Sequence, residues 1–117
     1  MIRDFADYVS DMLNSLKELE QFTAGMNFET FARDRKTINA VVRSLEVMGE
    51  AAKQIPDDIR TKHPAIPWKR IAGMRDKLIH QYWGVDTEIV WTVIKEELPP
   101  IKPLVEKVLR DLGEAER

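Results

Sequence analysis

Apolar residues recur every three or four positions along nearly the whole chain, which is the spacing of one face of an α-helix. The first run consists of Ile2, Phe5, Val9, Met12, Leu16, Leu19 and Phe22. Gly25 can end this helix, and Asn27 can cap a short turn through Phe28 and Phe31. The second long run consists of Ile38, Val41, Val42, Leu45, Met48, Ala52 and Ile55. Pro56 ends it.

The second half of the chain continues the same pattern. We expect a short helical piece over 57–62 and a third long helix from Pro67 to about Gly84. Asp86 can cap a fourth helix, which Pro99 and Pro100 break or kink, and a last helix runs over about 101–112. The sequence therefore predicts an all-α fold, a compact antiparallel bundle of about four to five helices in one domain spanning 1–117.

Composition limits the chemistry that this chain can perform. Cysteine is absent, so the chain has no disulfide and no thiolate metal site, and we expect a cytoplasmic protein. No apolar run approaches the ~20 residues that cross a membrane. The five glycines are scattered rather than gathered in a phosphate-binding loop, and the two histidines, His63 and His80, lack a partner at metal-ligand spacing. We therefore predict neither a cofactor nor a metal.

Positive charge is concentrated in one stretch of an otherwise acidic chain. Residues 60–77 contain six basic residues and one acidic residue, a net charge of +5, whereas the whole chain carries −2. Such a strip can hold a phosphate backbone, and it can equally be a solvated basic surface. Lys69, Arg70 and Lys77 are the candidates for RNA contact within it.

One arginine lies where the third helix is otherwise apolar. On a helical projection Arg75 falls in the middle of an arc formed by Trp68, Ile71, Ala72, Leu78, Ile79, Tyr82 and Trp83. A buried guanidinium needs a compensating partner because it stays charged. Glu46 and Glu50, one turn apart, can supply that partner or form a solvated edge. The alternative is a functional role for Arg75.

One short motif consists of Arg75, then His80 after four intervening residues, then Tyr82 after one more. It resembles the motif of the HepT-like toxins, a branch of the HEPN superfamily. The resemblance extends through 22–26, 34–37, 45–53, 66–68, 73–76 and 84–86. It covers about 3–110. It implies a HEPN-like helical bundle that forms a two-fold homodimer and acts as a metal-independent endoribonuclease. Arg75 and His80 are about 140° apart on an ideal helix, so two copies across an axis would complete the site better than one.

The motif suggests a mechanism in which the 2′-hydroxyl of RNA is the nucleophile. An imidazole has an unperturbed pKa of ~6.5, so His80 can take or give the proton. Arg75 can stabilise charge on the phosphate, and Asp76, one turn before His80 on a continuous helix, can orient the ring. Without the resemblance, His80 is equally well a surface histidine.

Tyr82 and the tryptophans each have a simpler interpretation as packing residues. In the proteins that this sequence resembles, the tyrosine equivalent to Tyr82 is adenylylated by a minimal nucleotidyltransferase antitoxin, which would block the phosphate site beside Arg75. Trp68 and Trp83 can stack bases, but core packing explains them as well.

Two other functions remain open. The chain can be a non-catalytic helical binding subunit of a nucleotidyltransferase, although retention of both Arg75 and His80 favours catalysis. A purely structural bundle leaves Arg75 unexplained unless Glu46 or Glu50 neutralises it.

Overall fold

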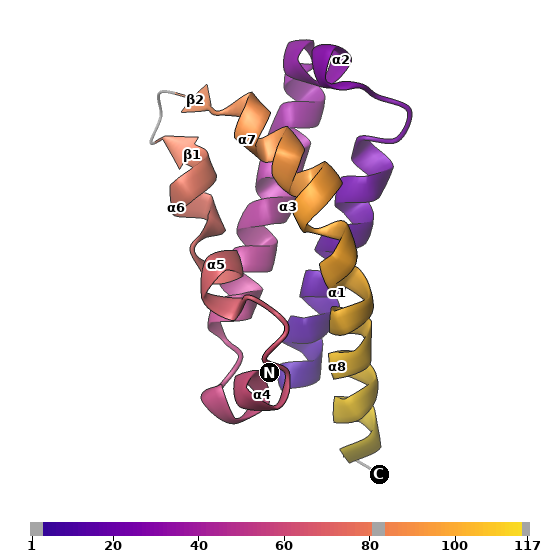
Figure 1. The fold of residues 1–117 in the computed structure, drawn as a ribbon, viewed down its shortest axis with the longest axis vertical. Helices are drawn as coiled ribbons and strands as arrows, with labels where there is room; N and C mark the ends of the chain where they lie inside the picture. Colours follow the sequence, from indigo (N-terminus) through magenta and orange to yellow (C-terminus); the bar gives the residue numbers. More distant parts are fainter. Residues whose placement is uncertain (1–3, 81–83, 116–117) are drawn as a thin grey trace.

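The computed structural model describes residues 4–80 and 84–115; for Arg75, 78–80 and 114–115 it describes the backbone alone. The longest helices are α1 (Phe5–Phe22), α3 (Arg35–Lys53) and α8 (Lys102–Ala115). α1 packs against both α3 and α8, and these helices run along the long axis of the molecule (Figure 1). The predicted all-α fold is confirmed.

Local capping explains where the first helices begin. The Asp4 carboxylate accepts a hydrogen bond from the Asp7 amide (3.0 Å) at the start of α1. Asn27 and Thr30 exchange side-chain and backbone hydrogen bonds at the start of α2 (Phe28–Arg33), a reciprocal capping box. The Asp34 carboxylate caps α3 through the Thr37 amide (3.1 Å). The predicted Asn27 cap is confirmed.

The core is built from the apolar faces that the periodicity predicted. Val9, Met12, Leu16 and Leu19 of α1 are buried, as are Val41, Leu45, Met48 and Ala52 of α3 and Val105 and Val108 of α8. Phe31 of α2 is buried against Trp91, with ring centroids 5.1 Å apart. This contact holds α2 to α7 (Thr87–Thr92) at the end of the molecule away from both termini (Figure 1).

The expected third long helix is wrong in its second half. After α4 (Asp57–Lys62), α5 (Trp68–Ala72) ends at Gly73, and α6 (Met74–Leu78) follows directly. β1 (Ile79–His80) then pairs antiparallel with β2 (Gly84–Val85). Gly73 weakens helix continuity, β-branched Ile79 favours extended backbone, and Gly84 adopts a φ of +138° that suits glycine alone. The apolar spacing after Leu78 therefore does not mark a helix.

The predicted kink at Pro99 and Pro100 is confirmed. Because neither proline has an N–H, the regular hydrogen-bond ladder cannot continue through them. α7 instead widens into a π-helical turn, η1 (Val93–Glu97), in which the Leu98 amide donates to the Val93 carbonyl (2.9 Å). A 3-10 turn, η2 (Pro99–Ile101), then leads into α8. Among the described residues, every helix falls short of the length and apolar character that crossing a membrane requires.

Candidate functional site

The segment with the predicted catalytic residues is packed against α3 through a glycine. A Cβ added at Gly49 would lie 3.2 Å from the Ile71 carbonyl oxygen and 3.5 Å from that of Ala72. α5 therefore approaches α3 at a distance that only a residue without a side chain permits without adjustment. Both α5 and α6 contact α3 (Figure 1). Gly49 thus fixes how deeply the helix that precedes Arg75 sits on the bundle.

The inner faces of α5 and of the start of α6 are part of the core. Trp68, Ile71 and Met74 are buried, with 5%, 0% and 4% of their surface exposed. The Trp68 indole N–H donates to the His63 carbonyl (3.0 Å), which anchors the connector before α5. The core interpretation of Trp68 is confirmed, whereas Trp83 lies outside the described residues.

Arg75 and His80 are carried by two different elements. Arg75 belongs to α6 and His80 to β1, so the angle of about 140° expected for one continuous helix does not apply. Asp76 is exposed on α6, and its expected position one helical turn before His80 is wrong for the same reason. The side chains of Arg75 and His80 lie outside the described part of the chain.

His80 is held in a short antiparallel pair. Ile79 pairs with Val85 and His80 pairs with Gly84. Tyr82 lies outside the described residues. The continuous helix on which its predicted place beside Arg75 depended ends at Leu78. Its role as the modified residue stays a prediction.

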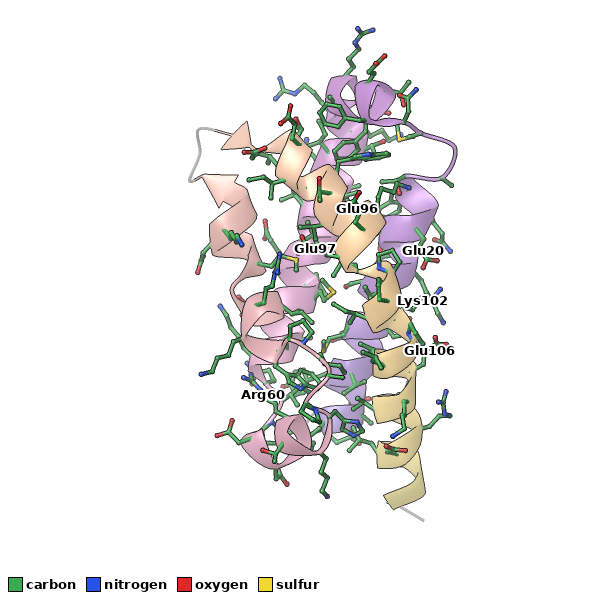
Figure 2. All side chains as sticks on the ribbon, in the orientation of Figure 1. Glu20, Arg60, Glu96, Glu97, Lys102 and Glu106 are labelled. Carbon is green, nitrogen blue, oxygen red and sulfur yellow. The ribbon has the colours of Figure 1, made fainter. Side chains whose placement is uncertain are left out.

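The basic strip is partly used for structure. The Arg60 guanidinium donates to the Ile55 carbonyl (Nε, 2.9 Å) and the Ala52 carbonyl (Nη2, 2.8 Å) at the C-terminus of α3 (Figure 2). The Ala52 carbonyl also accepts from the Ile55 amide (3.2 Å), and Ile55 lies just beyond α3, so Arg60 adds a charged donor to the carbonyls at this helix end and complements the helix dipole. Arg60 is therefore a capping residue, a role that sequence spacing could not reveal.

The three RNA-contact candidates differ in their surroundings. Lys69 on α5 and Lys77 on α6 are exposed. Arg70 is about half exposed and forms an ion pair with Glu97 of η1. Glu97 was absent from the sequence-based candidates, because its direction depends on the π-helical turn of which it is the last residue, and the sequence did not predict that turn.

The carboxylates proposed as partners of Arg75 have neighbours on α3 itself. Arg43 Nη1 is 3.7 Å from Glu46 Oε2, and Lys53 Nζ is 3.2 Å from Glu50 Oε1. Glu50 is exposed, which agrees with a solvated edge. Within the described residues, no group of three or more His, Asp or Glu side chains could hold a metal ion.

Comparison with protein families and curated proteins gives one consistent result. The family model described as "Ribonuclease HepT-like" matches residues 12–108. The chain is 46% identical over 108 residues to a protein of Thermococcus cleftensis with the name "Probable ribonuclease HepT", which covers 92% of this chain and 98% of that protein. No solved structure matches the chain with statistical significance.

Two further relatives have similar names. A protein of Methanocaldococcus jannaschii that is named a putative RNase is 49% identical over 112 residues, 96% of this chain and 97% of that protein. One from Caldanaerobacter subterraneus, named in the same way, is 44% identical over 103 residues, 88% of this chain and 92% of that protein. All three matches extend over most of both chains.

Proposed function

This chain belongs to the ribonuclease HepT-like family, and from that membership we propose that it is a metal-independent endoribonuclease toxin of the HEPN type. The observation that carries the proposal is the family match over 12–108, a range that includes Arg75, His80 and Tyr82. The names of the relatives support the ribonuclease activity at 44–49% identity.

The chemistry needs no metal because RNA contains its own nucleophile. One His80 removes the proton of the 2′-hydroxyl, and the 2′-oxygen attacks the adjacent phosphorus. The bond from phosphorus to the 5′-oxygen breaks, and a second His80 gives its proton to that leaving oxygen. Arg75 stabilises the negative charge that develops on the phosphate. The products are a 2′,3′-cyclic phosphate and a 5′-hydroxyl.

Two copies of the chain supply the two proton-transfer groups. A single chain offers one Arg75 and one His80 on separate short elements. A two-fold homodimer with its α6–β1 segments facing each other brings two arginines and two histidines to one cleft. Asp76 supports this cleft by balancing the charge of the arginines.

Control of such an activity is proposed to act at Tyr82. A minimal nucleotidyltransferase antitoxin transfers AMP from ATP to the Tyr82 hydroxyl, with release of pyrophosphate. The attached phosphate and purine then occupy the space that RNA needs beside Arg75. The position of Tyr82, two residues after His80, supports this proposal.

The enzymatic part is tested with the two histidines as a matched pair. We expect the wild-type chain, expressed alone, to slow growth and to cleave RNA in the presence of a chelator. His80→Ala should remove both effects, with cleavage reduced about 10²–10⁴-fold. His63→Gln, which alters a histidine beside Asp111 of α8, should cleave like the wild type. Equal cleavage by His80→Ala and wild type would disprove the assigned role.

The regulatory part is tested by mass spectrometry. The chain is co-expressed with a nucleotidyltransferase encoded next to it, and the peptide containing Tyr82 is analysed. We expect one or more added adenylates, with loss of cleavage, and neither change in Tyr82→Phe. Modification at Tyr8, the other tyrosine, in place of Tyr82 would contradict the proposal.

A further inference from the structure

A cavity of about 340 Å³ opens between α5 and the η2–α8 stretch. Its wall is apolar and is formed mainly by Ile71, Met74, Leu98, Ile101 and Leu104. Arg70 and Glu97 stand at its rim and form an ion pair. This combination of an apolar interior and two opposite charges at the rim is typical of small-ligand sites, which span about 300–1,000 Å³. We call it the α5–α8 cavity.

The α5–α8 cavity lies next to the proposed catalytic element. Met74, one of its wall residues, is the first residue of α6 and directly precedes Arg75. Ile71, another wall residue, carries the backbone carbonyl oxygen that lies nearest to Gly49 of α3. A ligand in the cavity would therefore contact the same two helices that position the arginine.

The π-helical turn gives Glu97 its position. In a regular α-helix Glu97, seven residues after the fully buried Val90, would lie on the same buried face. The wider turn over Val93–Glu97 shifts this register, and Glu97 is instead about one-third exposed. Figure 2 shows Glu97 on the side of the helix that faces α5. Glu96 is exposed and is not part of the cavity wall.

We propose that the α5–α8 cavity binds a guanine base of the RNA substrate, with Glu97 on the base edge and Arg70 on a neighbouring phosphate. The inference rests on the proposed ribonuclease function and adds a base preference to it. Single-stranded RNA can turn a base out of its stack, so that a flat ring enters an apolar slot while its phosphate stays outside. The apolar wall fits the ring, and the guanidinium at the rim fits the phosphate.

Guanine fits Glu97 better than the other bases do. Its Watson–Crick edge has two adjacent donors, N1–H and the N2 amino group, which match the two oxygens of a carboxylate. Adenine and cytosine have a ring acceptor beside their amino group, and uracil has a carbonyl on each side of its one donor. Each of these bases would therefore bring an acceptor close to a carboxylate oxygen, and two acceptors repel each other. A carboxylate has about four acceptor sites, so Glu97 can keep Arg70 while it binds the base.

Binding is measured with the full-length His80→Ala chain, which keeps the RNA intact. The probes are fluorescent uridine decamers that contain one central guanosine, adenosine or cytidine, or uridine throughout. We expect the guanosine decamer to bind about tenfold more tightly than the others, the discrimination typical of a good bidentate base contact. Fluorescence anisotropy gives the four dissociation constants.

Variants of the wall residues test whether the preference for guanosine arises in the α5–α8 cavity. Glu97→Gln should bring the guanosine decamer to within about twofold of the uridine decamer, whereas Glu96→Gln, the same change one residue away, should keep the full preference. Ala65→Trp, at an exposed position of the cavity wall, should fill the cavity and also remove the preference. Melting temperatures equal to that of the parent chain confirm that these variants fold.

The outcomes separate this inference from the proposed function. Binding and cleavage of RNA without a base preference, or with a preference that Glu97→Gln leaves intact, would overturn the guanine site and leave the ribonuclease in place. Failure of the wild type to cleave any RNA would overturn the proposed function. A cavity that binds an apolar side chain of a partner protein instead would give equal constants for all four decamers.

Discussion

α3 and the segment from α5 to β2 lie side by side, yet they are stabilised in different ways. α3 is a single helix of 19 residues with a continuous buried face. In its described residues, 68–80 and 84–85, the segment beside it has two helices of five residues each and two strands of two residues each. Helices this short have little stability of their own, and an isolated two-stranded pair is marginal in water.

The difference suggests separate roles for the two regions, with α3 as the stable scaffold and the segment from α5 to β2 as the carrier of the proposed catalytic residues. Every residue proposed for catalysis, Arg75, Asp76 and His80, is on the short elements, while α3 contributes Gly49, against which the backbone of α5 packs. Proteins often combine a rigid scaffold with reactive groups on less regular structure. Changes in α3 should therefore alter stability first, and changes in the adjacent segment should alter activity first.

The largest expected effect is on the stability of the scaffold. Leu45→Ala removes a side chain of α3 that is 1% exposed, and we expect it to lower the free energy of unfolding by about 2–5 kcal/mol. Chemical denaturation followed by circular dichroism measures this, with exposed Lys36→Ala as the control. A loss below 1 kcal/mol would mean that the buried face of α3 is not the main source of stability.

A substitution in the adjacent segment should lower activity and leave stability nearly unchanged. Arg75→Lys keeps the charge but loses the planar set of donors, and we expect RNA cleavage to fall about 10²–10³-fold, comparable with removal of one transition-state donor. The melting temperature should stay within about 2 °C of the wild type, since lysine keeps the positive charge and a long side chain at this position. A large fall in melting temperature would instead make Arg75 a structural residue, as in the structural-bundle alternative.

Gly49→Ala acts on the contact between the two regions. The new methyl would lie 3.2 Å from the Ile71 carbonyl oxygen, so α5 must move outward by a few tenths of an ångström. We expect a loss of about 1–3 kcal/mol in stability and a fall in cleavage, because Arg75 follows α5. Gly113→Ala, at a glycine with open space around it, is the matched control. Lower activity at unchanged stability would show that the contact serves only to position the site.

The smallest effect concerns the start of α3. Hydrogen bonds from the Thr37 backbone, and then from its side chain, lower the pKa of Asp34 below its ordinary value of 3.8. A lowered folded-state pKa stabilises the protein above the unfolded pKa, and this stabilisation disappears as pH falls through the folded value. The melting temperature of wild type should therefore fall more steeply below pH 4 than that of Asp34→Asn. Parallel curves would show that the cap is not linked to protonation.

The helices with uninterrupted apolar spacing could be predicted from the sequence, because a buried face repeats along each of them. α1 and α3 follow their predicted runs, and Asn27, Pro56 and Pro99 act as boundaries where expected. The change from α6 to β1 could not be predicted in this way. Leu78 and Ile79 satisfy the spacing of a buried helix as well as that of a strand.

The residues of the candidate site stay a prediction, and the single helix that was expected to hold them was wrong. Arg75 and His80 were recognisable from their spacing and from the resemblance, which does not depend on the helix continuing. The capping role of Arg60 and the pairing of Arg70 with Glu97 depend on contacts between residues 5 to 27 positions apart. Such contacts follow from the tertiary fold, so a local pattern cannot reveal them.

The pairing of His80 with Gly84 has a thermal consequence. Gly84 adopts a backbone conformation that other residues reach only with strain. It pairs directly with His80, the residue proposed to transfer protons. A two-residue ladder opens at lower free energy than the long helices do, as local opening generally precedes global unfolding. On gentle heating the protein would therefore lose its RNA-cleaving activity while its circular dichroism spectrum still showed intact helices. Cooling would restore the activity.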